Sequence, residues 1–345
     1  MIKPVDYPLI EPITDLNRPF WSVMIPTMDR PHYLEQALKS VLAQKIPSQD
    51  MQIEVVGDDL TPPSIQKLVE NISEGKAVFS RQKGRRSQAE QWTTCIRRAK
   101  GRWVHVFHDD DVLTPGFYQT YQTFIEKYPE AILVFCRAFS MNEEGEPGDP
   151  MEMPPENKSS GIVRNALEHL IICDYIAAPS AVVKRDIYEK IGGPDPNLHY
   201  ALDWELFLRV TALGPIGYIH DPHIFYRQHS KTVSIDFIRR GMNMDESRKV
   251  VRRGLPFLPT EVRPKIWKKF QENGARRSLR NSSRLLETRY FRGAWRQTLW
   301  ALCLQPSRKG FVQLARILFY RFFKFRKTVH QNSEKTVTAA AENKT

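Results

Sequence analysis

Three consecutive carboxylates, Asp109, Asp110 and Asp111, directly follow the apolar run of residues 103–107. That run is rich in β-branched and aromatic residues, which is typical of a strand buried on both faces. Adjacent carboxylates repel one another unless a cation offsets their charge. Mg²⁺ and Mn²⁺ bind oxygen ligands, commonly one or two carboxylates together with substrate phosphates. The triplet therefore predicts a divalent-metal site, and a solvated acidic turn is the simpler alternative.

Two further carboxylates occupy positions where they could do chemistry. Asp58 comes just after a strand-like run at residues 52–56, and Asp203 lies in a segment with leucines at helical spacing. Glu205 lies about 200° around the same helix from Asp203, so the two carboxylates are not expected to share one role. A helix N-cap is the alternative for Asp203.

The surrounding elements alternate between strand and helix. Strand patterns occur at residues 20–26, 52–56 and 77–80, and helical patterns at 32–44, 64–72 and 88–100. Pro31 suits the first turn of its helix. This alternation at βαβ length predicts an α/β fold with a mostly parallel, doubly wound sheet. Ligands of such sheets sit beyond the carboxyl ends of the strands, where the aspartate triplet would lie.

The second half of this region is less regular. We expect helices at residues 117–128, 163–172 and 201–210, and extended segments at 131–139 and 181–184. A long loop without periodicity spans residues 142–160, and such loops are usually functional or mobile. The region closes near residue 236. Residues 1–19 form an N-terminal extension, so the main domain is expected to cover residues 20–236.

Composition indicates a packed globular protein with a divided charge. Of the 345 residues, 41% are hydrophobic, and the four cysteines form no CxxC pair, so free thiols in a reducing compartment are expected. The N-terminus lacks the apolar core of a signal peptide, and no stretch reaches the length of a membrane span. Residues 237–330 hold 24 Lys and Arg against 5 Asp and Glu, whereas residues 1–236 hold 25 against 32. A basic region on an acidic body suggests an anionic partner.

The basic region, residues 237–330, has the pattern of helices with interleaved aromatic residues. Near its end Phe311, Leu314, Leu318, Phe322 and Phe325 fall close to one helical face, beside Arg and Lys. This is typical of a helix lying on an anionic membrane, and an amphipathic helix docked on the main domain is the alternative. No base-stacking motif of recognised spacing occurs, so no nucleic-acid partner is expected. Residues 331–345 are polar and expected to be disordered.

Five segments in order carry a resemblance to a known family. They read VMIPTMDRPHYLEQALKSVLAQ, IEVVGDD, GRRSQAEQWTTCIRRAKGRWVHVFHDDDVLTP, GGPDPNLHYALDWELFLRV and YRQHSKTVS, and together they cover about residues 20–235. Their order and spacing resemble the family 2 glycosyltransferases, an inverting group with the GT-A fold. The resemblance implies transfer of a sugar from a nucleotide diphosphate-sugar, usually a UDP- or dTDP-sugar, to an acceptor hydroxyl, with Mn²⁺ or Mg²⁺.

The resemblance also assigns site residues. Pro26, Thr27 and Arg30 match the turn that borders the nucleotide, and Asp58 matches the acid that pairs with the base, although Gly57 replaces the first acid of the usual pair. A carboxylate can accept a hydrogen bond from the imide N–H of uracil or thymine. The loop from Gly84 to Ser87 corresponds to the one beside the base and ribose, and Arg85 or Arg86 could reach the diphosphate. The binding residues implied in this way are Pro26, Thr27, Arg30, Asp58, Arg85, Ser87 and Asp109.

The metal and catalytic positions follow from the same comparison. His108 stands where many members carry the first acid of the DxD-like motif, so the metal ligands implied are Asp110 and Asp111, with His229 completing the site in some members. Asp109 would bind the ribose or the metal shell. Asp203 matches the catalytic base, which removes the acceptor proton as the hydroxyl attacks the sugar.

The sequence thus predicts a metal-dependent inverting glycosyltransferase of the hexosyltransferase type, acting in polysaccharide or glycolipid assembly. It is expected in the cytoplasm, peripherally at the inner face of the cell membrane. One alternative is a sugar-1-phosphate nucleotidyltransferase, which would normally carry a Gly- and Arg-rich loop after its first strand. The other is a non-catalytic nucleotide-sugar-binding module, which would lack the base.

Overall fold

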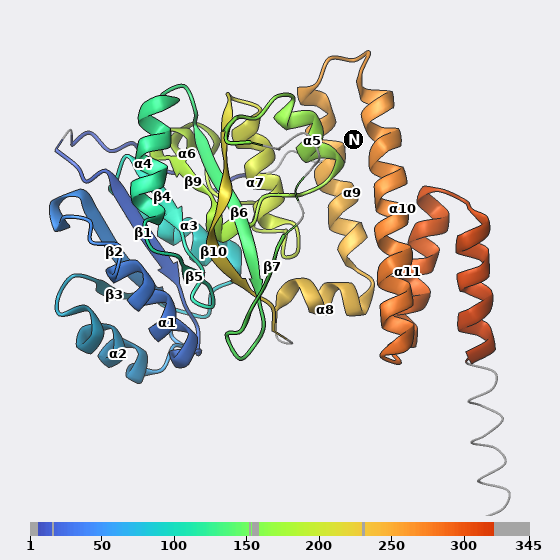
Figure 1. Ribbon diagram of the computed structural model, residues 1–345, viewed down its shortest axis with the longest axis horizontal. Coiled ribbons are helices and arrows are strands. Elements are labelled where there is room, and N and C mark those ends of the chain that lie inside the picture. Colours follow the sequence, from blue (N-terminus) through green and yellow to red (C-terminus); the bar gives the residue numbers. More distant parts are fainter. Residues whose placement is uncertain (1–5, 16, 152, 154–158, 230–231, 321–345) are drawn as a thin grey trace, which may run out of the picture. The chain divides into compact units, whose positions relative to one another are not determined.

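The computed structural model describes residues 6–15, 17–151, 153, 159–229 and 232–320. These residues divide into two compact units (Figure 1). The sheet unit comprises residues 1–232 and 249–263, and the helical unit comprises residues 233–248 and 264–345. The polar tail at 331–345, together with Phe322 and Phe325 of the expected amphipathic face, lies outside the described residues.

One sheet organises the sheet unit, in the order β3-β2-β1-β4-β9-β6-β10-β5 (Figure 1). Its long strands pair in parallel, β1 with β2 and β4, β2 with β3, and β6 with β10, whereas the short strands β5, β7, β8 and β9 pair antiparallel. The strands are β1 (Trp21–Pro26), β2 (Met51–Gly57), β3 (Val78–Arg81), β4 (Trp103–Val106), β5 (Val112–Leu113), β6 (Leu133–Met141), β7 (Pro147–Pro150), β8 (Gly161–Ile162), β9 (Val182–Lys184) and β10 (Ile216–Arg227). The predicted α/β fold is confirmed.

Six helices of this unit lie close to the expected positions, whereas α6 (Arg185–Ile191) was not predicted. The helices are α1 (Pro31–Leu42), α2 (Pro63–Ser73), α3 (Gln88–Arg98), α4 (Phe117–Lys127), α5 (Ala166–Ile172), α6 (Arg185–Ile191) and α7 (Leu202–Thr211), with short 3-10 turns η1 (Ser48–Asp50), η2 (Ala178–Ser180) and η3 (Leu255–Phe257). Helix α5 begins three residues later than the pattern predicted, after Asn165 in the left-handed region. The loop expected at residues 142–160 contains the edge strand β7, which pairs with β6.

Strand β1 is buried on both of its faces and contributes to the hydrophobic core. Trp21, Val23 and Ile25 of β1 enter one hydrophobic cluster together with side chains of α1, α2 and α4. The intervening residues Ser22 and Met24 are also buried, so both faces of β1 are covered. Burial on both faces explains why β1 reads as a continuous apolar run instead of an alternating one. The strand is therefore a rigid base for whatever follows Pro26.

The N-terminal extension packs on the same unit. The backbone N–H of Gly193 donates to Pro8 O at 2.8 Å, and Tyr7 Oη donates to Glu205 Oε1 at 2.6 Å. Arg209 pairs with Glu205 at 3.0 Å and lies over the Tyr7 ring. Glu205 is thus held in a buried structural ion pair, in agreement with its expected exclusion from the chemistry.

The helical unit contains α8 (Val233–Arg240), most of α10 (Arg263–Glu287), α11 (Phe291–Leu304) and helical residues 308–320. Helix α9 (Asn243–Gly254) begins in this unit and ends in the sheet unit. Gln297 of α11 donates to Asn243 at 2.6 Å, and Ser282 of α10 lies 2.8 Å from Thr298 of α11, so polar contacts bind these helices together. Among the described helices, none is sufficiently long and apolar to traverse a lipid bilayer. Among the described residues, none of the four cysteines forms a disulfide.

Candidate active site

The turn after β1 and the turn after β4 meet at the point where the strand order reverses. Strand β1 lies between β2 and β4, so β2 continues the sheet on one side of β1 and β4 continues it on the other. Thr27, the first residue after β1, donates from Oγ1 to Asp109 Oδ2 at 2.8 Å. In doubly wound sheets, the crevice at such a switch point is the usual ligand site. The aspartate triplet therefore lies at the end of the sheet where the sequence analysis expected it.

Asp110 has the richest set of polar partners in the triplet. Arg30 forms an ion pair with its Oδ2 atom, and His229 Nε2 lies 2.9 Å from the same oxygen. Burial opposes ionisation of this carboxyl, but the bond from His229 and the charges of His108 and Arg30 hold its pKa below the ordinary value. Asp110 is thus a carboxylate at neutral pH.

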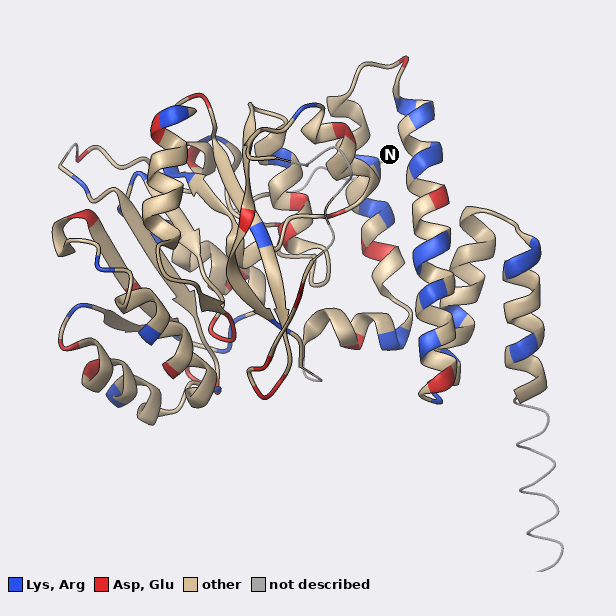
Figure 2. Ribbon diagram, in the orientation of Figure 1, with Lys and Arg blue, Asp and Glu red and all other residues tan. Residues whose placement is uncertain are grey.

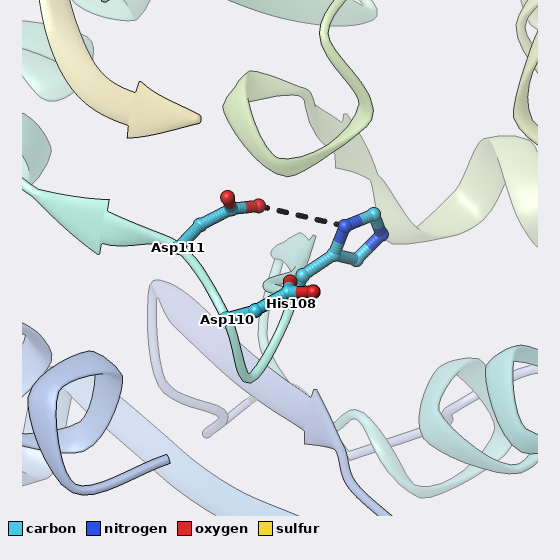
Figure 3. Close-up of side chains that lie close together, drawn as sticks. All are labelled: His108, Asp110 and Asp111. Atoms are coloured by element: carbon cyan, nitrogen blue, oxygen red, sulfur yellow. Dashed lines mark ion pairs between the residues drawn. The ribbon is translucent and has the colours of Figure 1, made fainter. Parts of the chain in front are cut away.

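Asp111 is held differently. Its Oδ1 accepts from the backbone N–H of Arg227 at 2.8 Å, and Oδ2 lies 3.5 Å from His108 Nδ1, the contact dashed in Figure 3. Burial raises its pKa to about 6, with the charge of Asp110 adding to the effect. Its Oδ2 and Nε2 of His108 are buried without a hydrogen-bond partner among the described residues. A buried carboxylate oxygen that has no hydrogen-bond partner and lies 3.5 Å from a ring nitrogen is a donor set that a cation would satisfy.

A divalent ion fits these residues. His108, Asp110 and Asp111 each offer one donor atom, and the three atoms lie within 4.8 Å of one another (Figure 3). Two carboxylates and one imidazole suit Mn²⁺ better than Mg²⁺, because Mg²⁺ strongly prefers oxygen ligands. The sequence reasoning treated His108 as a departure from the motif and missed it as a donor. Its place directly before the aspartates was the available signal.

His229, expected as a ligand, contacts Asp110 instead of standing among these three donors. Arg30 Nη1 lies 3.1 Å from His229 Nε2, so both groups gather on one side of Asp110. The buried Arg227 at the end of β10 supports the arrangement: its Nε donates to Asp110 O at 2.8 Å and its Nη2 to Gln36 at 2.6 Å. Sequence reasoning did not single out Arg227, since only the fold brings β10 beside the triplet.

Asp203 shares the electrostatic environment of the triplet. It lies in the first turn of α7, whose N-cap is Ala201, so the alternative of an N-cap role is wrong. Burial raises its pKa, and the hydrogen bond from Trp204 N and the charge of His108 act in the opposite direction. Burial lowers the pKa of His108, but its contact with Asp111 and the charges of Asp111, Asp110 and Asp203 raise it more. Asp203 and the triplet therefore act on one histidine.

The pKa of Tyr226, the penultimate residue of β10, is affected by the same carboxylates. Burial raises its pKa, and the charges of Asp111, Asp203 and Asp110 raise it further. The two groups of carboxylates come from elements almost a hundred residues apart in the chain. Both groups of carboxylates are therefore close enough to Tyr226 and His108 to change their pKa values.

Four further residues were expected to bind the nucleotide: Pro26, Asp58, Arg85 and Ser87. Asp58 is fully buried, and its carboxylate accepts from Leu60 N at 2.9 Å and from Arg86 N at 3.0 Å, so it anchors the loop before α3. Ser87 caps α3 through a reciprocal bond with Glu90, which occupies its hydroxyl. The Arg85 side chain is exposed, with no hydrogen bond or ion pair to the described residues. Pro26 is buried at the end of β1.

Comparison with known proteins supports the fold that positions these residues. Residues 22–192 match the family described as glycosyl transferase family 2. Staphylococcus aureus TarS 1–349 in complex with UDP-GlcNAc has a TM-score of 0.53 at 14% identity, covering 83% of this chain and 91% of that one. Mannosyltransferase PcManGT from Pyrobaculum calidifontis, in complex with GDP-Man and Mn²⁺, has a TM-score of 0.55 at 18% identity, covering 95% and 86%.

A search of curated proteins found no match. The likeness to the two solved structures establishes the fold, and the family match covers the strands that carry the aspartate triplet. The resemblance to the family 2 glycosyltransferases that the sequence predicted is confirmed over residues 22–192, about half of the chain.

Proposed function

We propose that the chain is a metal-dependent, inverting hexosyltransferase that uses a UDP- or dTDP-sugar. Its acceptor is a hydroxyl group of a carbohydrate or glycolipid in polysaccharide or glycolipid assembly. The catalytic domain is the sheet unit, and the basic region predicted from residue 237 onward contributes residues 249–263 to that unit and its other described residues to the helical unit. The observation that carries the proposal is the cluster of donor atoms from His108, Asp110 and Asp111, with Asp203 close enough to raise the pKa of His108.

In this proposal the nucleotide-sugar donor lies at the end of the sheet where the turns after β1 and β4 meet. Thr27, Asp109 and Pro26 border the nucleotide, Asp58 accepts from the base, and Arg30 and Arg85 face the diphosphate. Arg30 already stands beside Asp109 and Asp110, at 3.8 Å from Asp109 Oδ1. A planar guanidinium in that position suits phosphate oxygens. TarS holds UDP-GlcNAc and PcManGT holds GDP-Man and Mn²⁺ on the same fold, which supports a nucleotide-sugar and a divalent ion here.

The divalent ion would be held by His108, Asp110 and Asp111, with His229 and Arg227 orienting the aspartates. When bound, such an ion stabilises negative charge on a departing diphosphate. Because Asp110 is ionised and Asp111 titrates near pH 6, both carboxylates are charged under neutral conditions. A metal ion binds carboxylate ligands in this ionised form.

Transfer then needs one base. Asp203 takes the proton of the acceptor hydroxyl while the oxygen forms a bond to C1 of the sugar, on the face opposite the breaking bond to the diphosphate. The electron pair of that breaking bond leaves with the nucleotide diphosphate. The raised pKa of Asp203 makes it a better proton acceptor than an exposed aspartate, and general-base catalysis of this type contributes about 10²- to 10⁴-fold. We place the enzyme in the cytoplasm, at the inner face of the membrane.

The test is a donor panel. UDP-, dTDP- and GDP-sugars are incubated with the full chain in Mn²⁺, in Mg²⁺ and in EDTA, and release of nucleoside diphosphate is measured. Release from a uridine or thymidine donor with a divalent ion, absent in EDTA and in Asp203→Asn, is expected. Pyrophosphate release from a nucleoside triphosphate and a sugar phosphate would identify a nucleotidyltransferase instead. Binding of a donor without turnover under any condition would identify a binding module.

A further inference from the structure

A basic groove lies within the helical unit, between α10 and residues 308–320. It has a volume of about 410 Å³. One wall carries Arg280 and Ser283 of α10, and the other carries Arg308, Lys309, Gln313 and Arg316. Four of these six side chains are cationic, and the groove lining contains no acidic residue. Figure 2 shows Lys and Arg on successive turns of α10 and again along residues 308–320.

The four cations are not neutralised by the protein around them. Within the described residues, no ion pair involves Arg280, Arg308, Lys309 or Arg316. Residues 264–320 contain 13 Lys and Arg against 2 Glu, so the repulsion is not relieved at longer range either. Arg308 and Lys309 stand in the first turn of their helix, where a cation is unfavourable with respect to the helix dipole. A bound anion would relieve both costs.

The floor of the groove is ordered by buried polar contacts. Gln313 is 5% exposed, and its Nε2 donates to Ser282 Oγ at 3.1 Å. Its Oε1 accepts from Arg316 Nη1 at 3.3 Å, so Gln313 fixes the direction of that guanidinium. Ser282 in turn lies 2.8 Å from Thr298 of α11. Arg316 is therefore oriented by a side chain that itself belongs to the packed interior.

The outward side of the same helix is apolar. Phe311, Leu318 and Phe319 are 59%, 52% and 61% exposed. At 100° per residue they fall within about one-third of the helix circumference, next to the groove-lining Val312 and Arg316. Exposed aromatic and aliphatic side chains beside a basic groove are the arrangement of a helix at a lipid–water interface. A nucleic-acid site would instead place its stacking rings among the cations.

We propose that this groove binds the phosphate of an anionic phospholipid headgroup at a bilayer surface, while Phe311, Leu318 and Phe319 enter the interfacial layer. The proposal deepens the membrane association of the proposed function by assigning the site, and it does not depend on sugar transfer. It predicts a preference for phosphatidylglycerol or phosphatidylserine over phosphatidylcholine, because the charge complementarity is with the headgroup. It also predicts weakening by salt, since exposed charges are screened.

The experiment is vesicle co-flotation of the full chain without any nucleotide-sugar. A variant with Arg280→Gln, Arg308→Gln and Arg316→Gln should bind vesicles containing 30% phosphatidylglycerol roughly 100-fold more weakly than the wild-type chain, as each basic side chain at such a surface contributes about fivefold. The matched control removes the same charge from exposed positions of the helical unit outside the groove, with Arg276→Gln, Arg284→Gln and Arg292→Gln. It should lose much less affinity. Equal losses in the two triple variants would show diffuse attraction and overturn the groove assignment.

Three further arms separate the ligand sources. Phe311→Ser with Phe319→Ser should weaken flotation at 0.5 M salt, where apolar insertion is the remaining attraction. Inorganic phosphate at millimolar concentration should compete only weakly, and strong competition would assign the groove to a soluble phosphate. Homopolymeric RNA that binds more tightly than vesicles and responds to the groove variant would overturn the lipid assignment. Circular dichroism and nucleotide release in detergent confirm that each variant is folded, so a failure here is distinguishable from failure of the proposed catalysis.

Discussion

Arg30 and Asp110 form an ion pair that joins the turn after β1 to the turn after β4. The two residues are 80 positions apart in the chain, and only the pairing of β1 with β4 brings them together. Asp110 also contacts His229, so a cation and an imidazole converge on one carboxylate oxygen. A metal ion and a diphosphate at this place would each compete with, or replace, one of these contacts.

Replacing Asp110 should remove the metal site. Asp110→Asn loses one of two carboxylates among the three donors, so Mn²⁺ affinity should fall at least tenfold. Metal-dependent donor affinity should fall with it. Isothermal titration with Mn²⁺ and then with the nucleotide diphosphate measures both. Asp50→Asn, an exposed aspartate before β2, is the matched control and should bind normally. Unchanged Mn²⁺ affinity in Asp110→Asn would refute the ligand assignment.

The substitution Arg30→Gln should change the affinities for the metal ion and for the nucleotide in opposite directions. Loss of its charge beside Asp109 and Asp110 favours a competing cation, so Mn²⁺ affinity without nucleotide should rise by a few fold, limited because the Arg30 side chain is 34% exposed. Affinity for the nucleoside diphosphate should fall by about tenfold, the value of one charge-assisted contact. Arg102→Gln, an exposed change before β4, should alter neither. A parallel fall in both affinities would mean that Arg30 is needed for the fold of the turn and not for the diphosphate.

Asp203→Asn should retain donor binding and lose transfer. The side chains are nearly equal in size and the bond from Trp204 N can be kept, so turnover should fall by about 10³-fold while the donor Kd changes little. Single-turnover kinetics and equilibrium binding give the two numbers. Near-normal turnover would exclude Asp203 as the base.

Glu205→Gln is the control for that experiment. Glu205 lies two residues away in the same helix, but it pairs with Arg209 and Tyr7. Breaking a buried pair costs about 3–5 kcal/mol, so this variant should show a lower Tm. Its turnover below that Tm should be close to normal, because Glu205 does not face the triplet's histidine.

When kcat is measured as a function of pH, its decline on the acid side should begin above the ordinary pKa of an aspartate. Asp203 has to be unprotonated to accept the acceptor proton, and burial raises its pKa. As pH falls through that raised pKa, kcat should decline tenfold per pH unit, beginning above pH ~4, the value of an exposed aspartate. A profile measured with saturating metal isolates this group. A limb at or below pH 4 would contradict the burial argument.

Asp111 should make both metal affinity and metal-free stability depend on pH. Its pKa in the folded protein is about 6, above the unfolded value of ~4, so the carboxylate penalises folding above pH 6 and the penalty disappears below pH 4. In EDTA, Asp111→Asn should therefore raise the free energy of unfolding at pH 7.5 by about 1–3 kcal/mol. Denaturant unfolding at pH 7.5 and pH 4.5 checks this, and the gain should be much smaller at the lower pH, where Asp111 is mostly protonated in the folded protein. Destabilisation at pH 7.5 would show that Asp111 is ionised at no cost. In the wild-type chain, Mn²⁺ binding should weaken below pH 6.

The sequence alone determined the local elements and the type of chemistry. Apolar runs of β-branched residues fixed β1, β2 and β4, Pro31 fixed the start of α1, and the aspartates after β4 indicated a cation site, because each signal depends on neighbours within a few residues. The family resemblance identified Asp203 as the candidate base and gave the roles of the nucleotide-binding and metal-binding residues.

Only the tertiary structure decided which side chains share the site. It brought Arg30, His229 and Arg227 to the triplet, added His108 as a donor and assigned Ser87 to capping α3. It also formed the groove between α10 and residues 308–320 from two separate segments. These relations depend on strand pairing and helix packing between residues 25 to almost 200 positions apart, and a sequence pattern contains no distance between such residues.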